Sequence, residues 1–507
     1  MSINFLEHTK SYTEKEHVLE HKGDFLFISE KMSAKKTFHK ENVRAVIVIF
    51  SFFLTLSAIV LLVWGSLSLW IMFFSIILFL YFSSLILKAF LVIVSFAKTI
   101  PEPTLKEIQD IADVDLPPYT VLVPMYKENQ LLISFVKYFK NIDYPKDKLD
   151  VRILLEEDDK ETINVANNMN LEAPFSVVVI PNVGPRTKPK ALNVGFIDDK
   201  SEILTIYDAE DRPELDQLKK VAWSFNNLSD KVVCVQAKLT FYNPNENLLS
   251  KWFSAEYNSW FNHFLPALFS LSLPIPLGGT SNHFKTSILK EIGGWDPYNV
   301  TEDADLGIRI SRHGYKISMI DSTSVRRTTG DSGLNQPIAV IESSTYEEAN
   351  TKLGNWMYQR IRWMKGYLQT AIVNLRHPVK AAMDLSWRGF FSFFFFLIGT
   401  PITHLLNLFA WTVTILWLMD YAVMPIGIPD FLLLGGWISF VGGNTFFILL
   451  HFIPAMVARK WKIALASLLI PLYWFLMSIA TVVAVYELFK RPHHWNKTEH
   501  GISKVFF

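Results

Sequence analysis

Two patterns of apolar residues divide the chain. Long runs with almost no charge cover residues 45–64, 69–96, 387–419, 431–457 and 463–485. About 20 consecutive apolar residues suffice for a helix to cross the hydrocarbon core of a membrane. From Tyr119 onward, short apolar runs instead alternate with stretches of helical periodicity, which is typical of an α/β domain with a mostly parallel sheet. The pattern therefore predicts an α/β domain flanked by transmembrane helices.

Basic residues orient the first membrane region. Lys35, Lys36, Lys40 and Arg44 precede the first apolar run and Lys98 follows the second, whereas the connecting residues 65–68 carry no charge. Positively charged flanks of transmembrane helices remain in the cytoplasm. We therefore expect a transmembrane hairpin with both ends, and hence the central domain, on the cytoplasmic side.

The expected domains follow from these patterns. They are a cytosolic N-terminal segment (1–44), the transmembrane hairpin (45–97), a cytosolic α/β domain with interfacial helices (98–385), C-terminal transmembrane helices (386–487) and a tail (488–507). With three C-terminal spans, the basic residues 459–462 lie in the cytoplasm and the tail lies outside. If residues 387–419 instead form two passes, the tail lies in the cytoplasm and residues 459–462 lie outside. We favour a cytosolic tail and about six spans, with part of this region alternatively lying along the interface.

Acidic residues follow several of the predicted strands. Strands are expected at residues 119–124, 151–155, 176–180, 203–207 and 232–235. The first is followed by Tyr126 and Glu128, the second by Glu156 and Glu157, and the fourth by Asp208. Ligands of open α/β sheets bind at the carboxyl ends of the strands. These side chains are therefore candidates for one binding site.

Two carboxylates after the fourth strand fit a metal ion. Asp208 and Glu210 lie two residues apart on a turn after an apolar strand. Mg²⁺ usually takes one or two protein carboxylates together with phosphate oxygens. Uncompensated carboxylates at this position would be costly, so a divalent cation is their natural partner. A solvated acidic turn is the alternative interpretation.

A second acidic cluster begins a predicted helix. Thr301 is the expected N-cap, Glu302, Asp303 and Asp305 fall in the first turn, and Gly314 ends the helix. The helix dipole stabilises each such carboxylate by at most about 1 kcal/mol at the surface. Three acids exceed what stability requires, so this stretch is either a well-capped surface helix or part of a site shared with the other acids.

Three further stretches have both a functional and a structural interpretation. The basic loop 186–190 contains Lys188 and faces either a diphosphate or water. The small residues of 277–282 include Gly279 and Thr280, which let a sugar approach the backbone closely or form an ordinary loop. Gln359, Arg362 and Trp363 lie in a helical run, where they hold sugar rings and phosphate or dock the helix at the bilayer surface.

Composition excludes several classes of protein. A net charge of +1 and a pI near 7.8 argue against a nucleic-acid partner. The single Cys234 excludes disulfide frameworks and cysteine-rich metal sites. No P-loop and no Gly-x-Gly-x-x-Gly motif occurs, which argues against kinases and dinucleotide oxidoreductases. Residues 1–41 lack the features of a secretory signal, so we expect the first transmembrane helix to direct membrane targeting.

The motifs occur in a recognisable order. Asp208-Ala209-Glu210, Thr301-Glu302-Asp303 and Gln359-x-x-Arg362-Trp363, with strand-end acids and flanking membrane segments, resemble the membrane-embedded family-two glycosyltransferases, such as bacterial cellulose, hyaluronan and curdlan synthases. The resemblance extends from about Tyr119 to Gly366. It implies a GT-A fold, an inverting reaction, a UDP-sugar donor and Mg²⁺ or Mn²⁺ as cofactor.

The resemblance also implies roles for individual residues. Donor-binding residues would be Tyr126, Glu128, Glu156, Glu157, Lys188, Asp208 and Arg362; metal ligands Asp208 and Glu210; the general base Asp303, beside Glu302; and acceptor-binding residues Gly279, Thr280, Gln359 and Trp363. This sequence departs from the family in two places. Glu210 replaces the second Asp of Asp-x-Asp, which leaves Asp211 as an alternative metal contact, and Glu156-Glu157 replaces a pair of Asp residues.

The C-terminal tail contains a looser match. Trp495-x-Lys497-Thr498 resembles the loops that fold over the nucleotide in cellulose and hyaluronan synthases, which would make Lys497 a donor contact. A membrane anchor with snorkelling side chains is the alternative. If the tail covers the donor, it must be cytosolic.

Three hypotheses about function remain. The leading one is a processive synthase in the plasma membrane, with a cytoplasmic catalytic domain, that uses UDP-glucose to polymerise a polysaccharide and translocate it across the bilayer. UDP-N-acetylglucosamine and GDP-mannose are the next candidate donors. The second hypothesis is a transferase that adds one sugar to a lipid-linked acceptor. The third is a non-enzymatic nucleotide-sensing or scaffold domain. The expected partners are a nucleotide sugar, a growing glycan and the lipid bilayer, with no nucleic acid.

Overall fold

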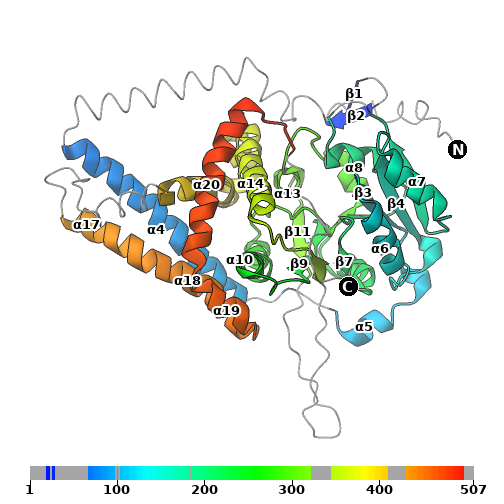
Figure 1. The fold of residues 1–507 in the computed structure, drawn as a ribbon, viewed down its shortest axis with the longest axis horizontal. Coiled ribbons are helices and arrows are strands. Elements are labelled where there is room, and N and C mark those ends of the chain that lie inside the picture. The colour runs from blue at the N-terminus through cyan, green and yellow to red at the C-terminus, as the bar shows by residue number, and fades with distance from the viewer. Residues whose placement is uncertain are drawn as a thin grey trace, which may run out of the picture.

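The computed structural model describes residues 19–22, 25–28, 67–97, 100, 103–182, 185–320, 344–408 and 430–495. A seven-stranded sheet lies at one end of the molecule and long apolar helices lie at the other (Figure 1). Helices α10 (Leu248–Ser259), α13 (Glu302–Arg312) and α14 (Leu353–Asn374) lie between these two parts. Residues 45–64, the first predicted membrane span, lie outside the described residues.

The large sheet is mixed and mostly parallel, as predicted. Its strands, in spatial order, are β11 (Lys316–Met319), β8 (Val232–Gln236), β10 (Asn282–Lys285), β6 (Ile203–Ile206), β3 (Tyr119–Met125), β4 (Leu149–Glu156) and β5 (Phe175–Ile180). Strand β10 is antiparallel to both of its neighbours, and the other pairs are parallel. All five predicted strands are therefore present, and β10 and β11 are additional.

Alternate residues of the central strands enter different cores. Leu122 and Leu154 belong to the core beneath helix α8 (Lys188–Phe196), whereas Val121 and Val123 belong to the core that holds α6 (Asn129–Phe139). This is the two-residue period of a sheet buried on both faces. The helices α5 (Leu105–Gln109), α7 (Lys160–Asn168), α9 (Gln217–Asn227) and α12 (Thr286–Ile292) complete the α/β domain.

The chain order creates a switch point in this sheet. From β3 the chain forms β4 and β5 on one side, and it then returns to form β6 on the other side of β3. Loops that leave β3 and β6 therefore diverge at the carboxyl ends of these strands. Such a crevice is where ligands bind in open α/β sheets.

A smaller sheet extends the domain toward the membrane helices. It consists of β7 (Arg212–Pro213), β12 (Ser344–Glu347) and β9 (Lys238–Phe241), in that order. Strand β12 follows residues 321–343, which lie outside the described residues, and it pairs in parallel with β9. A separate two-stranded hairpin comprises β1 (Leu19–Lys22) and β2 (Phe25–Ile28).

Four helices among the described residues are long and apolar enough to cross a membrane. They cover Leu78–Ala97 within α4 (Leu67–Ala97), Pro378–Leu408, Leu434–Val457 and Ile470–Lys490. The third of them consists of α17 (Asp430–Trp437), a π-helical turn (Ile438–Gly442) and α18 (Gly443–Val457). The fourth is α20 (Ile470–Lys490), which lies beside α14 (Figure 1).

The apolar run 463–485 does not form one continuous helix. Helix α19 (Trp461–Ser467) is separate, and α20 begins at Ile470 after Leu469 leaves the helical conformation. Pro471, near the start of α20, cannot donate the backbone hydrogen bond that a continuous helix would need. Residues 409–419, the end of another predicted run, lie outside the described residues.

Helix α15 (Pro378–Phe393) has the character of an interfacial helix. Val379, Met383, Trp387 and Phe391 recur every four residues and are 72%, 71%, 70% and 54% exposed. Such a stripe is suited to lie along a bilayer surface. Ser386 interrupts the helix with a φ of 60°, and a π-helical turn at Phe394–Gly399 follows it. The interfacial helices of the domain remain a prediction.

Candidate active site

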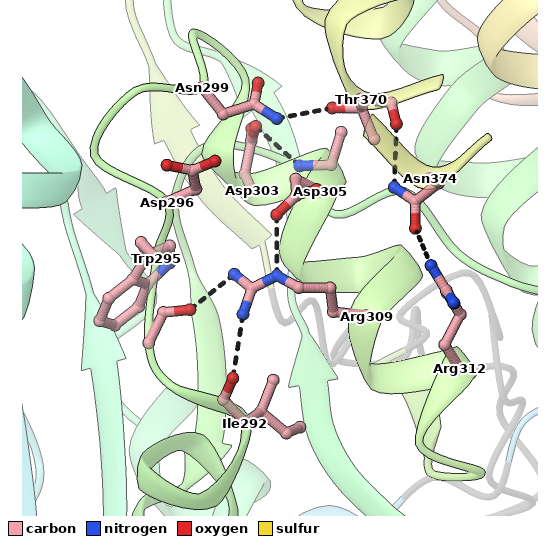
Figure 2. A network of polar contacts seen from close by, with 12 residues as sticks. Ile292, Trp295, Asp296, Asn299, Asp303, Asp305, Arg309, Arg312, Thr370 and Asn374 are labelled. Atoms are coloured by element: carbon pink, nitrogen blue, oxygen red, sulfur yellow. Dashed lines mark hydrogen bonds and ion pairs between the residues drawn. The ribbon is translucent and has the colours of Figure 1, made fainter. Parts of the chain in front are cut away.

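Helix α13 is fixed at its start by a buried network of polar contacts. The guanidinium of Arg309 donates to Asp305 Oδ2 at 2.8 Å, to the carbonyl of Ile292 at 3.2 Å and to that of Gly294 at 2.6 Å (Figure 2). The buried ion pair between Asp305 and Arg309 therefore holds the helix against the loop before it. Of the three acids in this turn, Asp305 has a structural role.

Helix α14 packs directly against the start of α13. Asn299 donates to Thr370 Oγ1 at 3.0 Å (Figure 2). The backbone N–H of Val300 donates to Gln369 Oε1 at 3.1 Å. A Cβ atom added at Gly366 would overlap the side chain of Thr301, so only glycine allows this approach. Thr301 begins the helix as predicted, but its buried hydroxyl makes no capping hydrogen bond.

The other two acids of this turn, Glu302 and Asp303, line a cavity. Glu302 is 3% exposed, and Asp303 is partly exposed and accepts a hydrogen bond from the backbone N–H of Ala304 at 2.8 Å. Burial and the neighbouring charge of Asp303 raise the pKa of Glu302 to about 8. Burial also raises the pKa of Asp303, although Arg362 and Lys188 oppose this change. Asp303 is therefore an ionisable group with increased basicity, as a general base requires.

Lys188 connects Asp208, the acid that follows β6, to the loop that contains Gly279. Its Nζ atom lies 2.5 Å from Asp208 Oδ1 and donates to the carbonyl of Gly279 at 2.8 Å. Burial alone would lower the pKa of Lys188, but the charges of Asp208 and Glu302 raise it above its usual value. Lys188 therefore remains a cation at the centre of an acidic region. An added Cβ at Gly279 would lie 3.5 Å from Asp303 Oδ2, which shows how closely this loop approaches the acid.

The structure distinguishes Glu210 from Asp211. Asp211 is buried, its Oδ2 accepts from the backbone N–H of Asp208 at 2.7 Å, and the hydroxyl of Thr280 also donates to it. Asp211 thus shapes the turn from the protein interior. Glu210 lines the cavity together with Asp208. Of the two alternatives for the second metal contact, Glu210 is the one that faces the cavity.

These groups surround a cavity of about 340 Å³, here named the donor cavity. Its walls contain the following residues expected from the sequence: Tyr126, Glu128, Glu156, Lys188, Asp208, Glu210, Gly279, Thr280, Glu302, Asp303, Gln359, Arg362 and Trp363. The cavity also contains Trp495 from the tail. Residues spread over about 370 positions of the chain thus meet at one place, between β3, β6, α13 and α14.

The basic loop before α8 is paired with strand-end acids. Arg186 lies 2.9 Å from Asp158, and the Nζ atom of Lys190 lies 2.8 Å from Glu156 Oε2. Together with the pair of Lys188 and Asp208, these contacts attach the loop to the ends of two strands. Lys188 and Arg186 of this loop line the cavity, and Arg186 is also exposed to solvent.

One predicted donor contact, Glu157, was wrong. Glu157 is exposed, it accepts from the backbone N–H of Asn182 at 3.1 Å, and it does not line the donor cavity. Successive side chains at a strand end point to opposite sides, so only Glu156 of this pair reaches the cavity. Lys497, another predicted donor contact, lies outside the described residues.

Helix α14 supplies an amide, a cation and an indole to the cavity. Gln359 Oε1 accepts from Asn350 at 3.0 Å, and Trp363 stacks on Tyr257 with 6.2 Å between the ring centroids. The guanidinium of Arg362 lies 4.7 Å from the ring centroid of Trp495. Trp495 of the tail therefore reaches the donor cavity.

Sequence analysis missed two acids and an aromatic residue. Glu347 and Glu348 come from β12 and the residue after it, Tyr257 comes from α10, and all three line the donor cavity. Burial and the charges of Asp211 and Asp208 raise the pKa of Glu347 well above its usual value. The acidic pair Glu347-Glu348 was visible in the sequence, but it follows no strand that the apolar pattern reveals.

A second cavity continues from the first into the apolar helices. It has a volume of about 130 Å³ and is here named the membrane cavity. Tyr257, Gly279, Asp303 and Trp363 line both cavities. Beyond them, the membrane cavity is walled by residues of α4, α18 and α20 and of the helix 378–408. Asp303 thus lies where the two spaces meet.

Comparison with known proteins identifies the α/β domain. Residues 117–366 match a family model described as "Glycosyltransferase like family 2". The chain carries a family-two glycosyltransferase domain. This domain includes every described donor-cavity residue except Trp495. The resemblance seen in the sequence and the expected GT-A fold class are thereby confirmed.

Similar proteins include glycosyltransferases whose names denote different products. The chain is 26% identical over 61% of its length to the probable glycosyltransferase YdaM of Bacillus subtilis, of which the match covers 72%. It is 24% identical over 44% of its length to a probable glucomannan 4-beta-mannosyltransferase of Arabidopsis thaliana, of which 42% is covered. A beta-monoglucosyldiacylglycerol synthase of Nostoc is 25% identical over 52% of this chain and 51% of that protein.

Solved structures also match. A mannosyltransferase from Pyrobaculum calidifontis, solved in complex with GDP-Man and Mn²⁺, is 18% identical, with a TM-score of 0.48 over 82% of this chain and 98% of that one.

Proposed function

We propose that the protein is an inverting, divalent-metal-dependent glycosyltransferase. In this proposal it takes a nucleotide sugar in the donor cavity and transfers the sugar to a saccharide whose end enters from the membrane cavity. The observation that carries the proposal is the position of Asp303 at the junction of the two cavities. A base at this point can meet an acceptor on one side and a donor on the other.

Asp303 would act as the general base. It accepts the proton of an acceptor hydroxyl while that oxygen attacks the anomeric carbon, and the bond from this carbon to the nucleoside diphosphate breaks. Attack from the face opposite the leaving group inverts the configuration, so the reaction needs one base and no covalent intermediate. Glu302, with a pKa of about 8, is protonated near neutral pH and leaves Asp303 as the charged member of the pair.

Lys188 and Arg362 would stabilise the departing diphosphate. Both line the donor cavity. Their positive charges oppose the increase in the pKa of Asp303 and Glu302 that burial causes, so both cations act on the reacting region. Fixed cations that face the developing negative charge of a leaving group are among the largest contributions to catalysis. Trp495, over the guanidinium of Arg362, would close the cavity from the tail side.

The residues of the donor cavity fit a divalent cation. Eight carboxylic acids but only three basic side chains line it among the described residues. No group of three His, Cys, Asp or Glu side chains in the described part forms a complete metal cage. This agrees with Mg²⁺ or Mn²⁺ held by Asp208 and Glu210 together with the donor phosphates. The ion would neutralise the diphosphate as it leaves.

The membrane cavity favours a polymer-forming enzyme over a single addition. It leads from Asp303 to residues of four apolar helices, and aromatic side chains such as Trp260, Phe396 and Trp474 line it. Aromatic faces are suited to hold sugar rings. We propose a processive enzyme that extends a glycan and passes it through these helices, with the α/β domain in the cytoplasm. The alternative is single addition to a lipid-linked acceptor, and the names of the relatives include both kinds.

A panel of nucleotide sugars tests the proposal. Purified protein in lipid nanodiscs is incubated with UDP-glucose, UDP-N-acetylglucosamine or GDP-mannose and with Mg²⁺, Mn²⁺ or EDTA, and the released nucleotide is measured. We expect one donor to be turned over, UDP-glucose first, with activity lost in EDTA.

Sizing of the radiolabelled product then separates the two acceptor classes. Chains of many sugars support processive synthesis, and one sugar per acceptor supports the alternative. If no donor is turned over under any of these conditions, the proposed function is wrong.

A further inference from the structure

The membrane cavity contains an ionisable cluster that the transfer reaction does not use. Lys88 lies near the middle of the candidate span Leu78–Ala97, and His404 and His451 line the same cavity from two other apolar helices. An ammonium group at membrane depth is costly and is retained where it has a partner or a function. Lys88 is therefore expected to have either a partner or a function.

No described carboxylate pairs with Lys88. Its contact in the cavity wall is the ring of Phe447, with Nζ 5.0 Å from the centroid. Among the described residues, the membrane cavity has two carboxylates, Glu256 and Asp303. Glu256 already accepts from Arg360 at 2.5 Å and from the Tyr473 hydroxyl at 2.6 Å. Asp303 also lines the donor cavity, which Lys88 does not, and Asp303 is the proposed base of the transfer reaction.

Two neighbouring groups also lack partners. His404 Nε2 and Trp474 Nε1 are buried, and neither makes a hydrogen bond within the described part of the chain. Their rings stack at 5.1 Å with an interplanar angle of 22°, and His404 is 3% exposed. His451 is held by a hydrogen bond between its Nδ1 and the carbonyl of Phe447 at 2.8 Å. Buried polar atoms without partners are rare in folded proteins. Here two of them border the same space as an ammonium group that has no carboxylate partner among the described residues.

The cavity is large enough for a small anionic group such as a carboxylate or a phosphate. Its volume is about 130 Å³, and a protein cavity of about 150 Å³ accepts a six-membered ring such as benzene. Hydroxyl groups of a neutral sugar would satisfy His404 and Trp474 but would leave the charge of Lys88 uncompensated. An anionic oxygen group satisfies all three at once.

We propose that this cluster binds an anionic oxygen group carried by the acceptor, either a carboxylate on a sugar ring or the phosphate of a lipid carrier. Lys88 supplies the charge, His404 and Trp474 supply hydrogen bonds, and the indole of Trp474 supports the adjoining ring. This inference rests on the proposed function, because it takes the membrane cavity to be the path of the acceptor. It makes the enzyme selective for a charged glycan or glycan carrier.

Binding measurements test the cluster independently of turnover. Full-length protein in nanodiscs is titrated calorimetrically with a neutral gluco-oligosaccharide, with an oligosaccharide of the same length that carries one glucuronate, and with a short-chain polyprenyl phosphate. We expect at least one anionic ligand to bind about tenfold or more tightly than the neutral one, as a charge-assisted hydrogen bond would give. The ligand that shows the gain identifies the source of the anionic group.

Variants of Lys88 show whether the cluster causes this preference. Lys88→Met keeps the aliphatic stem and should reduce the anionic-to-neutral affinity ratio to near one, whereas Lys88→Arg should retain it. Lys462→Met, which changes an exposed lysine of α19, is the matched control and should leave the ratio unchanged. Equal binding of all three ligands to the wild-type protein, or an unchanged ratio in Lys88→Met, would overturn the inference. Absence of nucleotide release with every donor would instead count against the proposed function.

Discussion

At the scale of single residues, the roles of neighbouring acids are set by the direction in which each side chain points. Asp303 and Glu302 line the donor cavity, whereas Asp305 pairs with Arg309 inside the protein. Asp208 and Glu210 line the cavity, whereas Asp211 holds the turn from within. The sequence predicted that these clusters of acids contribute to one site, and the structure brings members of each to the donor cavity. The sequence could not show which members face the cavity, because that depends on contacts with distant segments such as Thr280.

Glu302 gives a prediction about stability and pH. Its pKa is about 8 in the folded protein and 4.5 as an ordinary glutamate. The folded state therefore binds more protons than the unfolded state between these values, and stability due to protonated Glu302 is lost as pH rises through 8. Glu302→Gln removes this pH dependence of stability. A difference of one between the folded and unfolded pKa values corresponds to about 1.4 kcal/mol in the free energy of unfolding.

The measurement is the thermal unfolding midpoint in EDTA at pH 5, 6.5 and 8.5. The midpoint of Glu302→Gln relative to wild type should rise across this series. A constant difference between the two proteins would contradict the raised pKa. Glu157→Gln, at an exposed position outside the cavity, serves as the control and should show no trend.

Lys188 gives a prediction about the donor. Lys188→Met removes the cation between Asp208 and Gly279 that would meet the donor diphosphate. We expect donor affinity or turnover to fall by about tenfold to a hundredfold, the value of a charge-assisted hydrogen bond. Calorimetric titration with UDP and nucleotide release with the active donor check this. Unchanged values in both assays would remove Lys188 from the site.

At the scale of secondary-structure elements, the packing of α14 on α13 decides the position of Asp303, the proposed base. Gly366→Ala would force the added methyl group into Thr301 and displace the start of α13. We expect transfer to fall by about tenfold or more and unfolding stability to fall by about 1–3 kcal/mol, as overpacking in a core costs.

Helix α14 itself provides the matched control for that prediction. An added Cβ at Gly354 meets no atom within 4 Å, so Gly354→Ala should be neutral or slightly stabilising through helix propensity. Comparison of both variants in the same unfolding and transfer assays separates the effect of the contact with Thr301 from the effect of helix propensity. Equal behaviour of Gly366→Ala and Gly354→Ala would contradict the close contact between the helices.

The predictability of these elements differed for physical reasons. Five strands had the apolar runs of a buried parallel sheet, and all five are present. Strand β10 carries Asn282, His283 and Lys285, so its composition resembles a loop, and only its pairing with β6 and β8 makes it a strand. Strand β12 likewise depends on β9, which lies about a hundred residues earlier in the chain. Glu347 was missed together with the strand that carries it.

At the scale of the whole molecule, the important feature is the junction between two cavities. The donor cavity was predictable because motifs of recognisable spacing converge on it. The membrane cavity was not, because its walls come from apolar helices whose mutual packing leaves no simple pattern in the sequence. Its residues Lys88, His404 and Trp474 are spread over almost 400 positions of the chain.

The membrane cavity gives a prediction about product length. Trp474→Ala removes an aromatic side chain that lines this cavity and does not line the donor cavity. If the product leaves by this path, we expect shorter chains while donor-derived nucleotide release falls less than tenfold. Gel sizing of radiolabelled product measures this. Chains of wild-type length would show that the glycan leaves elsewhere.

The central claim is that Asp303 accepts the acceptor proton at the meeting point of donor and acceptor. The most direct measurement compares sugar transfer by wild type, Asp303→Asn and the control Glu157→Gln, with nucleotide affinity determined on the same preparations. We predict that Asp303→Asn loses transfer by about a hundredfold to ten-thousandfold, the usual contribution of a general base, while it and Glu157→Gln bind nucleotide like wild type. Transfer by Asp303→Asn within threefold of wild type would contradict the account.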